Sequence, residues 1–108
     1  MMFEAIVSCD FDSAVERVCE GLLKSRTGYT VTEQADYLIE GKKTAIRMIE
    51  RYASAIGERT AVQLTFIEDG KQIVINAIAS GYDGILFMHT REGQKAAIEA
   101  IRKITEEL

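Results

Sequence analysis

The chain has 108 residues, of which 47% are hydrophobic and 28% charged, and its formal net charge is −4. This length and composition predict a single globular domain over residues 1–108. The acidic balance disfavours nucleic acid as a partner, because phosphate binding needs a basic face. No apolar run approaches the ~20 residues that span a bilayer. We therefore expect neither a membrane anchor nor a signal peptide.

The two cysteines, Cys9 and Cys19, do not suggest a disulfide framework. If the segment between them is helical, the two residues lie about 14 Å apart along the helix axis, at roughly 1.5 Å per residue. A disulfide needs Cα atoms within about 7 Å of each other. We expect a cytoplasmic protein in which Cys19 is an inert thiol on the apolar side of the helix.

The N-terminal part predicts a strand over residues 3–8 and then an amphipathic helix. The apolar positions of this helix recur at spacings of three and one, which is typical of a helix with one buried side. Either Asp10 caps the helix start, or Ser13 and Glu16 form a capping box there. Gly28 marks the helix end. The apolar side carries Phe11, Ala14, Val15, Val18, Cys19, Leu22 and Leu23.

Residues 29–34 favour extended structure, and we interpret them as a connection or an irregular edge. Residues 36–40 and 43–53 predict a hairpin around Gly41-Lys42, where glycine at the first turn position suits a type II′ turn. Alternation divides the second strand between two faces. The face expected to meet the helices carries Ile46, Met48, Glu50 and Tyr52, and the outer face carries Lys43, Ala45, Arg47, Ile49 and Arg51.

Residues 60–68 and 71–79 predict a second hairpin around Asp69-Gly70, a sequence that favours a type I′ turn. A two-residue loop then makes one face apolar and the other mostly polar, as in a sheet that helices cover on one side. The expected pairs on the apolar face are Phe66 with Ile73, Leu64 with Ile75 and Val62 with Ala77.

Residues 85–88 predict a short strand, and Thr90 is the expected cap of a C-terminal helix. The order β-α-β-β-β-β-β-α indicates an α+β fold of two layers, with a curved antiparallel sheet of five to six strands and two helices on one face. This order resembles the TATA-binding-protein-like architecture and its helix-grip relatives. A shared fold does not by itself imply a function.

Glu50 is unexpected in this scheme, because alternation places its carboxylate on the predicted core face of its strand. One interpretation is a pocket for a small apolar ligand between the sheet and the C-terminal helix. The alternatives are a strand end close to solvent, or a β-bulge that turns the side chain outward. The predicted pocket residues are Tyr37, Met48, Glu50, Tyr52 and Phe87.

The outer sheet face is a second candidate site. Its basic stripe has no interleaved aromatic residues, so it does not indicate nucleic-acid binding. The apolar residues beside the stripe favour cover by a second subunit, whereas the alternative is a solvated face with scattered apolar residues. The predicted homodimer interface comprises Leu38, Arg47, Ile49, Arg51, Val74 and Ile78.

Catalytic and metal-binding motifs are missing from the sequence. His89 is the single histidine, and no nucleophile or carboxylate has a spacing that makes it a partner. A metal site would need His89, Cys9 and Cys19 together from three elements, so we predict no metal and no cofactor. An enzyme with Glu50 or His89 as acid or base is the least favoured interpretation.

Four short stretches are similar to a family of small uncharacterised bacterial proteins, a domain of unknown function. They are Glu50-Arg51-Tyr52, the loop that contains Gly57, residues 77–81 and residues 87–93. The resemblance spans roughly residues 36–105 and implies no activity, but it draws attention to Glu50, Arg51, Ser80 and Gly81. The predicted function is a non-enzymatic, homodimeric interaction or regulatory module, and the alternative is a module that binds a small apolar ligand.

Overall fold

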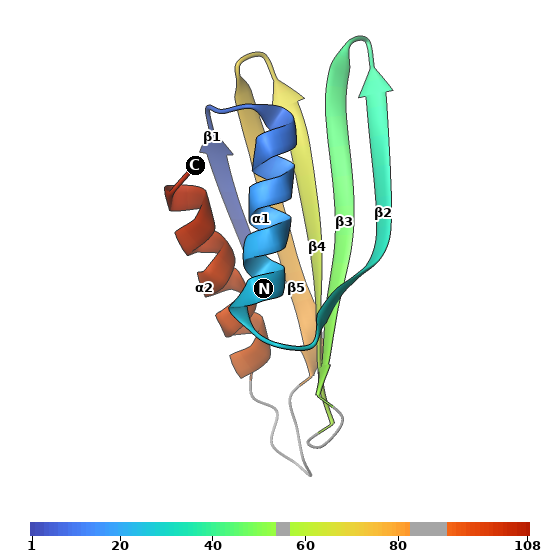
Figure 1. Cartoon of the computed structure of the whole chain (residues 1–108), viewed down its shortest axis with the longest axis vertical. Helices are drawn as coiled ribbons and strands as arrows, with labels where there is room; N and C mark the ends of the chain where they lie inside the picture. Colours follow the sequence, from blue (N-terminus) through green and yellow to red (C-terminus); the bar gives the residue numbers. More distant parts are fainter. Residues whose placement is uncertain (54–56, 83–90) are drawn as a thin grey trace.

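The computed structural model describes residues 1–53, 57–82 and 91–108. The molecule is elongated, with extents of 49 × 24 × 20 Å, and two helices cover one face of a single sheet (Figure 1). This confirms the α+β class and its layers. The predicted strand at 85–88 lies outside the described residues, as do Phe87, His89 and Thr90. The described elements are β1 (Met2–Val7), α1 (Phe11–Ser25), β2 (Tyr29–Ile39), β3 (Lys42–Ala53), β4 (Glu58–Asp69), β5 (Gln72–Tyr82) and α2 (Glu92–Glu106).

The sheet has the strand order β1-β5-β4-β3-β2, and every neighbouring pair is antiparallel. Four consecutive strands form a meander, and the N-terminal strand joins it beside β5. Residues 29–34 belong to the edge strand β2, whose register shifts between Val31 and Glu33. Of the two interpretations of this segment, the irregular edge is therefore the one confirmed.

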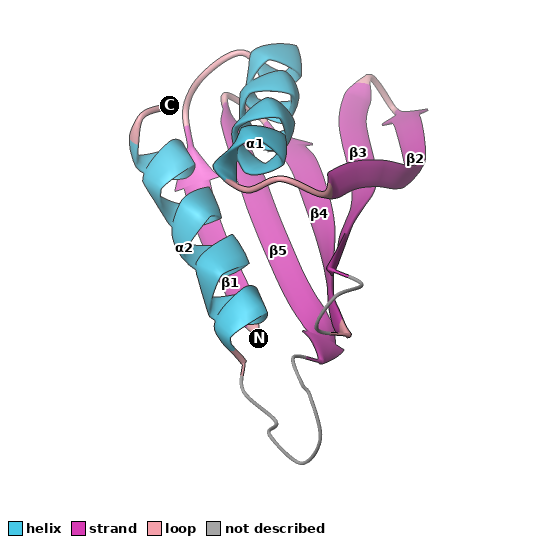
Figure 2. Cartoon of the chain, turned by 60° about the horizontal axis from the view of Figure 1, so that its bottom comes forward, coloured by secondary structure: helices cyan, strands magenta, loops and turns pink. Residues whose placement is uncertain are grey.

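The core lies between the sheet and the two helices. Asp10 caps α1, because its side chain accepts a hydrogen bond of 3.0 Å from the backbone nitrogen of Ser13. The predicted apolar stripe of α1 is largely buried, and so are Ile98 and Ile101 of α2. Figure 2 shows both helices on the same side of the sheet, with β3 and β2 extending past α1.

Both hairpin turns differ from the predicted ones by one residue. Ile39 pairs with Lys42, so Glu40-Gly41 form the first turn, and their φ values of 52° and 79° are typical of type I′. In the second hairpin Gly70-Lys71 form the turn, with positive φ at Gly70 alone, as in type II′.

The pairing register of each hairpin is consequently shifted by two residues. Phe66 pairs with Ile75 instead of Ile73, and Leu64 pairs with Ala77. A shift of two residues preserves the side of the sheet to which each side chain points. The predicted apolar face of β4 and β5 is therefore correct, although its individual pairs are not.

The predicted core face of β3 is wrong. Ala45 and Ile49 are 1% and 0% exposed, and they lie opposite Phe66 and Val62 on the side that the helices cover. The pairing of Ala53 with Glu58 fixes this parity. The residues of β3 that face away from the helices are Thr44, Ile46, Met48, Glu50 and Tyr52.

Arg47 and Arg51 are tolerated on the helix-facing side of β3 because each is paired there. A guanidinium nitrogen of Arg47 lies 2.9 Å from a carboxylate oxygen of Asp36, and one of Arg51 lies 2.8 Å from Glu58. Buried charges are retained only with such partners. The basic stripe predicted for the outer face is therefore not there.

Candidate functional site

The side of the sheet that faces away from both helices, here called the open face, has no covering element within residues 1–53, 57–82 and 91–108 (Figure 2). Ten large apolar side chains are exposed in these segments, and seven of them lie on the open face. Such a concentration exceeds the scattered exposure that is normal on a protein surface. The seven are Met2, Ile6, Tyr37, Ile39, Tyr52, Ile67 and Ile78.

One row of directly paired residues crosses the open face through all five strands, and four of its five side chains are apolar. From β2 to β1 the row, here called the apolar row, is Tyr37, Thr44, Ile67, Val74 and Ile6. Tyr37 is 51% exposed, Ile67 42% and Ile6 63%. The row therefore presents a continuous apolar strip to whatever lies beside the sheet.

Two carboxylates of the open face, those of Glu4 and Glu50, have local partners. Asn76 Nδ2 donates a 3.0 Å hydrogen bond to Glu4 Oε2, and Arg59 Nη2 donates one of 2.6 Å to Glu50 Oε1. The hydrogen bond from Arg59 is the largest cause that lowers the pKa of Glu50. Glu50 is thus an ionised, paired residue on a strand of the open face.

The predicted ligand pocket does not form from the residues assigned to it. Tyr37, Met48, Glu50 and Tyr52 lie on the open face, away from α2, and Phe87 is outside the described residues. The prediction failed because both alternating sets of β3 contain apolar residues, so alternation alone did not identify the core side.

Only two of the six residues predicted for the interface lie on the open face. Val74 and Ile78 lie on the open face, whereas Arg47, Ile49 and Arg51 face the helices. Leu38 is 68% exposed but lies opposite Lys43 on the helix-facing side. Met2, Ile6, Ile39 and Ile67 were not predicted from the sequence as interface residues. The alternation of Met2 and Ile6 within β1 was the available signal for two of them.

Arg51 joins the α1–β2 connection to the rest of the sheet. Its Nε donates a 2.8 Å hydrogen bond to the backbone oxygen of Thr27, and its Nη1 donates one of 2.8 Å to Glu58 Oε1. Arg26 lies 3.8 Å from the same carboxylate oxygen. Burial raises the pKa of the neighbouring Tyr29. These contacts link the α1–β2 connection to β3 and β4, and we assign the cluster a structural role.

The backbone conformation and the close packing at position 81 require a glycine. Its φ of +130° disfavours other residues, and a Cβ there would collide with the backbone oxygen of Arg59. Gln94 Nε2 donates a 3.0 Å hydrogen bond to the oxygen of Gly81, which ties α2 to β5. Of the residues that the family resemblance emphasised, Arg51 and Gly81 therefore hold the fold, and Glu50 and Ser80 lie on the open face.

A comparison with family models matches residues 1–108 to a family of unknown function, DUF6054. The chain belongs to this family. No curated protein matches the DUF6054 chain. A Pseudomonas aeruginosa crystal structure of a protein of unknown function, PA94, described as a candidate regulator, matches 99% of this chain and 71% of its own, with a TM-score of 0.53 and 16% identity. At that identity the likeness concerns the fold alone.

Other kinds of site find no support in the described parts of the DUF6054 chain. No helix there is long and apolar enough to cross a membrane, and no group of three His, Cys, Asp or Glu side chains is placed to hold a metal ion. Cys9 and Cys19 are free thiols, and burial raises the pKa of Cys19 to about 11. Cys19 is therefore a neutral thiol at physiological pH.

Proposed function

We propose that this DUF6054 protein is a non-enzymatic, cytoplasmic interaction module that forms a homodimer through its open face. The observation that carries the proposal is the apolar row, which crosses all five strands without cover from the described elements. Burial of such surface against a second copy removes it from water, and this is the main favourable term in protein association.

The open face is large enough for a stable dimer. β1 has 6 residues and the other four strands have 11 or 12, so a spacing of ~4.8 Å between strands and ~3.3 Å per residue give this face an area of about 800 Å². A standard interface buries about 800 Å² on each partner. Two such sheets stack ~10 Å apart with their strands about 30° from alignment.

A second copy suits this face better than a charged partner. A two-fold axis places the same patch on both subunits, so an apolar row meets apolar surface. The carboxylates Glu4 and Glu50 already have local partners in Asn76 and Arg59. Stacking therefore brings no unpaired charge of these residues into the interface, although the chain as a whole is acidic.

Sedimentation velocity at several protein concentrations tests the homodimer. Ile67→Lys puts a charge at the centre of the apolar row, and we expect this variant to sediment as a monomer where the wild type sediments as a dimer. Leu38→Lys is the control, because Leu38 is also apolar and is more exposed than Ile67, but lies on the opposite side of the sheet. A wild-type chain that stays monomeric at tens of micromolar would contradict the proposal.

A further inference from the structure

A groove runs between α1 and the helix-facing side of β2 and β3, away from the open face. Its main hollow has a volume of about 370 Å³, and a second hollow of about 280 Å³ continues it towards the β2–β3 turn. Both hollows share Phe11, Asp12 and Asp36. The floor of the main hollow is apolar and is made by Phe11, Val15, Cys19, Val31 and Ala45.

The groove exists because the two helices do not reach the edge of the sheet. Figures 1 and 2 show β3 and β2 extending past α1. Tyr29 is the one buried residue of β2, while Val31 and Leu38 are 41% and 68% exposed on the helix-facing side. In a two-layer fold this side of the sheet is the side that helices cover.

The walls of the groove are acidic. Asp12, Glu16 and Glu20 recur at every fourth residue of α1, which spaces them about 6 Å apart, and Asp36 stands on the opposite wall. Within the described segments, Glu16 and Glu20 have no hydrogen-bond or ion-pair partner. Like charges four residues apart destabilise a helix, so this row of carboxylates favours a cationic partner.

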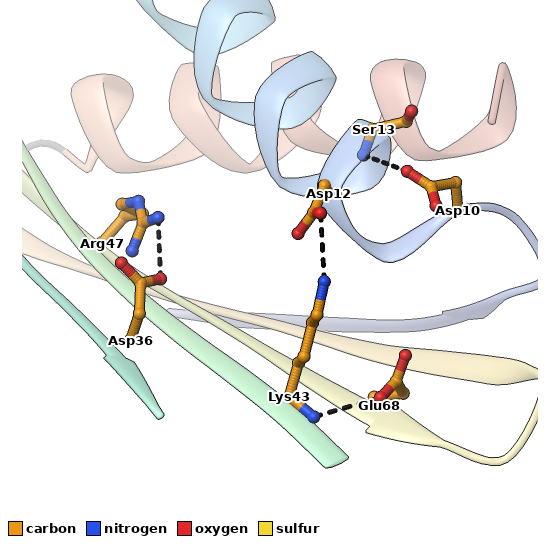
Figure 3. A network of polar contacts seen from close by, with 7 residues as sticks. All are labelled: Asp10, Asp12, Ser13, Asp36, Lys43, Arg47 and Glu68. Atoms are coloured by element: carbon orange, nitrogen blue, oxygen red, sulfur yellow. Dashed lines mark hydrogen bonds and ion pairs between the residues drawn. The ribbon is translucent and has the colours of Figure 1, made fainter. Parts of the chain in front are cut away.

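The cations beside the groove are already engaged, as Figure 3 shows. Lys43 Nζ lies 3.1 Å from Asp12 Oδ2, and Arg47 lies 2.9 Å from Asp36. Arg47 also donates hydrogen bonds to the backbone oxygens of Ala35 and Ile46. The lining of the main hollow therefore has four carboxylates and one guanidinium.

We propose that this groove binds a basic amphipathic helix of a partner protein. The apolar side of that helix packs on Val31 and Leu38, the two exposed apolar residues of the groove, and its lysines or arginines lie against Glu16 and Glu20. Cationic residues at every fourth position of a helix repeat at the same ~6 Å as these carboxylates. The occupant takes the place beside α1 where a further helix would cover β2 and β3.

This site does not depend on the proposed dimer, because it lies on the other side of the sheet. A dimer through the open face leaves the main hollow accessible in both subunits, because none of its lining residues belongs to the apolar row, whereas Tyr37 and Thr44 also line the second hollow. The result of a binding experiment at the groove is therefore independent of the sedimentation result.

The test uses a labelled 16-residue peptide with a leucine stripe and a lysine at every fourth residue, titrated with the full chain and followed by fluorescence anisotropy. The double variant Glu16→Lys/Glu20→Lys should bind at least about tenfold more weakly than wild type, since two attractive contacts become repulsive. The double variant Glu106→Lys/Glu107→Lys has the same net charge and should bind like wild type.

Two further measurements locate the peptide. Val31→Lys should also weaken binding, because it places a positive charge in the apolar floor of the groove. Val31 is already solvent-accessible, so the fold should tolerate the lysine. Amide chemical shifts should move in Val15, Cys19 and Val31, and the bound peptide should gain helical circular dichroism. Equal weakening in both double variants, shifts confined to the open face, or no binding at millimolar peptide would each overturn the proposal.

Discussion

Arg47 and Arg51 show that a charged residue does not by itself mark the exposed side of a strand. Each lies on the helix-facing side of β3, and each has a carboxylate within 3 Å. Isolated charges would be expelled from such a position, whereas paired ones are tolerated. The identity of a single residue therefore does not reveal its face unless its partner is known, and Asp36 and Glu58 come from other strands.

Removal of Arg51 should be costly. Its side chain is 12% exposed and that of Glu58 is 8%, so Arg51→Met leaves a buried carboxylate with only the more distant Arg26. We expect a loss of about 2 to 4 kcal/mol in the free energy of unfolding, measured with urea. The double variant Arg51→Met/Glu58→Gln should recover part of that loss. If it is no more stable than the single variant, the carboxylate is not the cause.

Asp10 should make the stability of the chain depend on acid pH. The hydrogen bond from the backbone nitrogen of Ser13 lowers the pKa of Asp10 from its ordinary 3.8 in the folded state (Figure 3). The stabilisation is therefore present above the unfolded pKa and is lost as the pH falls through the lower, folded value.

Asp10→Asn separates this titration from the cap itself, because asparagine caps helices about as well and does not ionise. Melting temperatures followed by circular dichroism should fall less steeply between pH 5 and pH 3 in the variant than in the wild type. Near pH 7 the two proteins should melt at similar temperatures. Parallel pH profiles would show that another carboxylate is responsible.

At the scale of elements, α1 and α2 pack closely because α1 has a glycine at position 21. A Cβ at Gly21 would collide with Ile104 Cδ1 and come within 2.9 Å of Ile104 Cγ1. Glycine inside a helix normally costs about 1 kcal/mol relative to alanine. The glycine at position 21 is therefore explained by the Ile104 side chain, which packs between the two helices in the space that a Cβ would take.

The effect of Gly21→Ala should consequently change sign with its neighbour. In the wild type we expect a loss of about 1 kcal/mol or more from overpacking. In an Ile104→Ala background, where both colliding atoms are gone, the same change should stabilise by up to about 1 kcal/mol through helix propensity. Urea unfolding of the four proteins of this cycle measures the coupling, and additive effects would refute a contact at this position.

The β2–β3 hairpin has an unfavourable residue at its turn. Glu40 has a φ of 52°, a left-handed conformation that asparagine adopts readily and glutamate does not. Glu40→Asn should raise the free energy of unfolding by about 0.5 to 1 kcal/mol. Glu40→Gln is the matched control for the lost charge, and it should leave stability nearly unchanged. Equal gains from both variants would point to charge and not to backbone conformation.

For the whole molecule, the sequence predicts the buried side of a strand correctly where only one of its two alternating sets of residues is apolar. Val62, Leu64 and Phe66 alternate with polar residues, so their face is unambiguous. In β3 both alternating sets mix charged and apolar residues, and only the pairing with β4 distinguishes them. The irregularity between Val31 and Glu33 breaks the alternation of β2, and for this reason that strand is predicted only in part.

The residues of the candidate sites could likewise be predicted only where one side of a hairpin is apolar. Val74 and Ile78 could be assigned to the open face because their hairpin has one apolar side. The apolar row and the groove depend on which strands become neighbours and on how far the helices extend across the sheet. These are properties of tertiary packing, and no local pattern specifies them.

The strand order also determines when the sheet can be completed during synthesis. Of the five described strands β1 is translated first, yet its partner β5 is translated last, and Met1 exchanges backbone hydrogen bonds with Ala79. At about 5 to 20 residues per second, β1 waits about 4 to 15 s for its partner. The strands β2, β3 and β4 can pair with one another in that interval, whereas β1 can join the sheet only after β5 has been made.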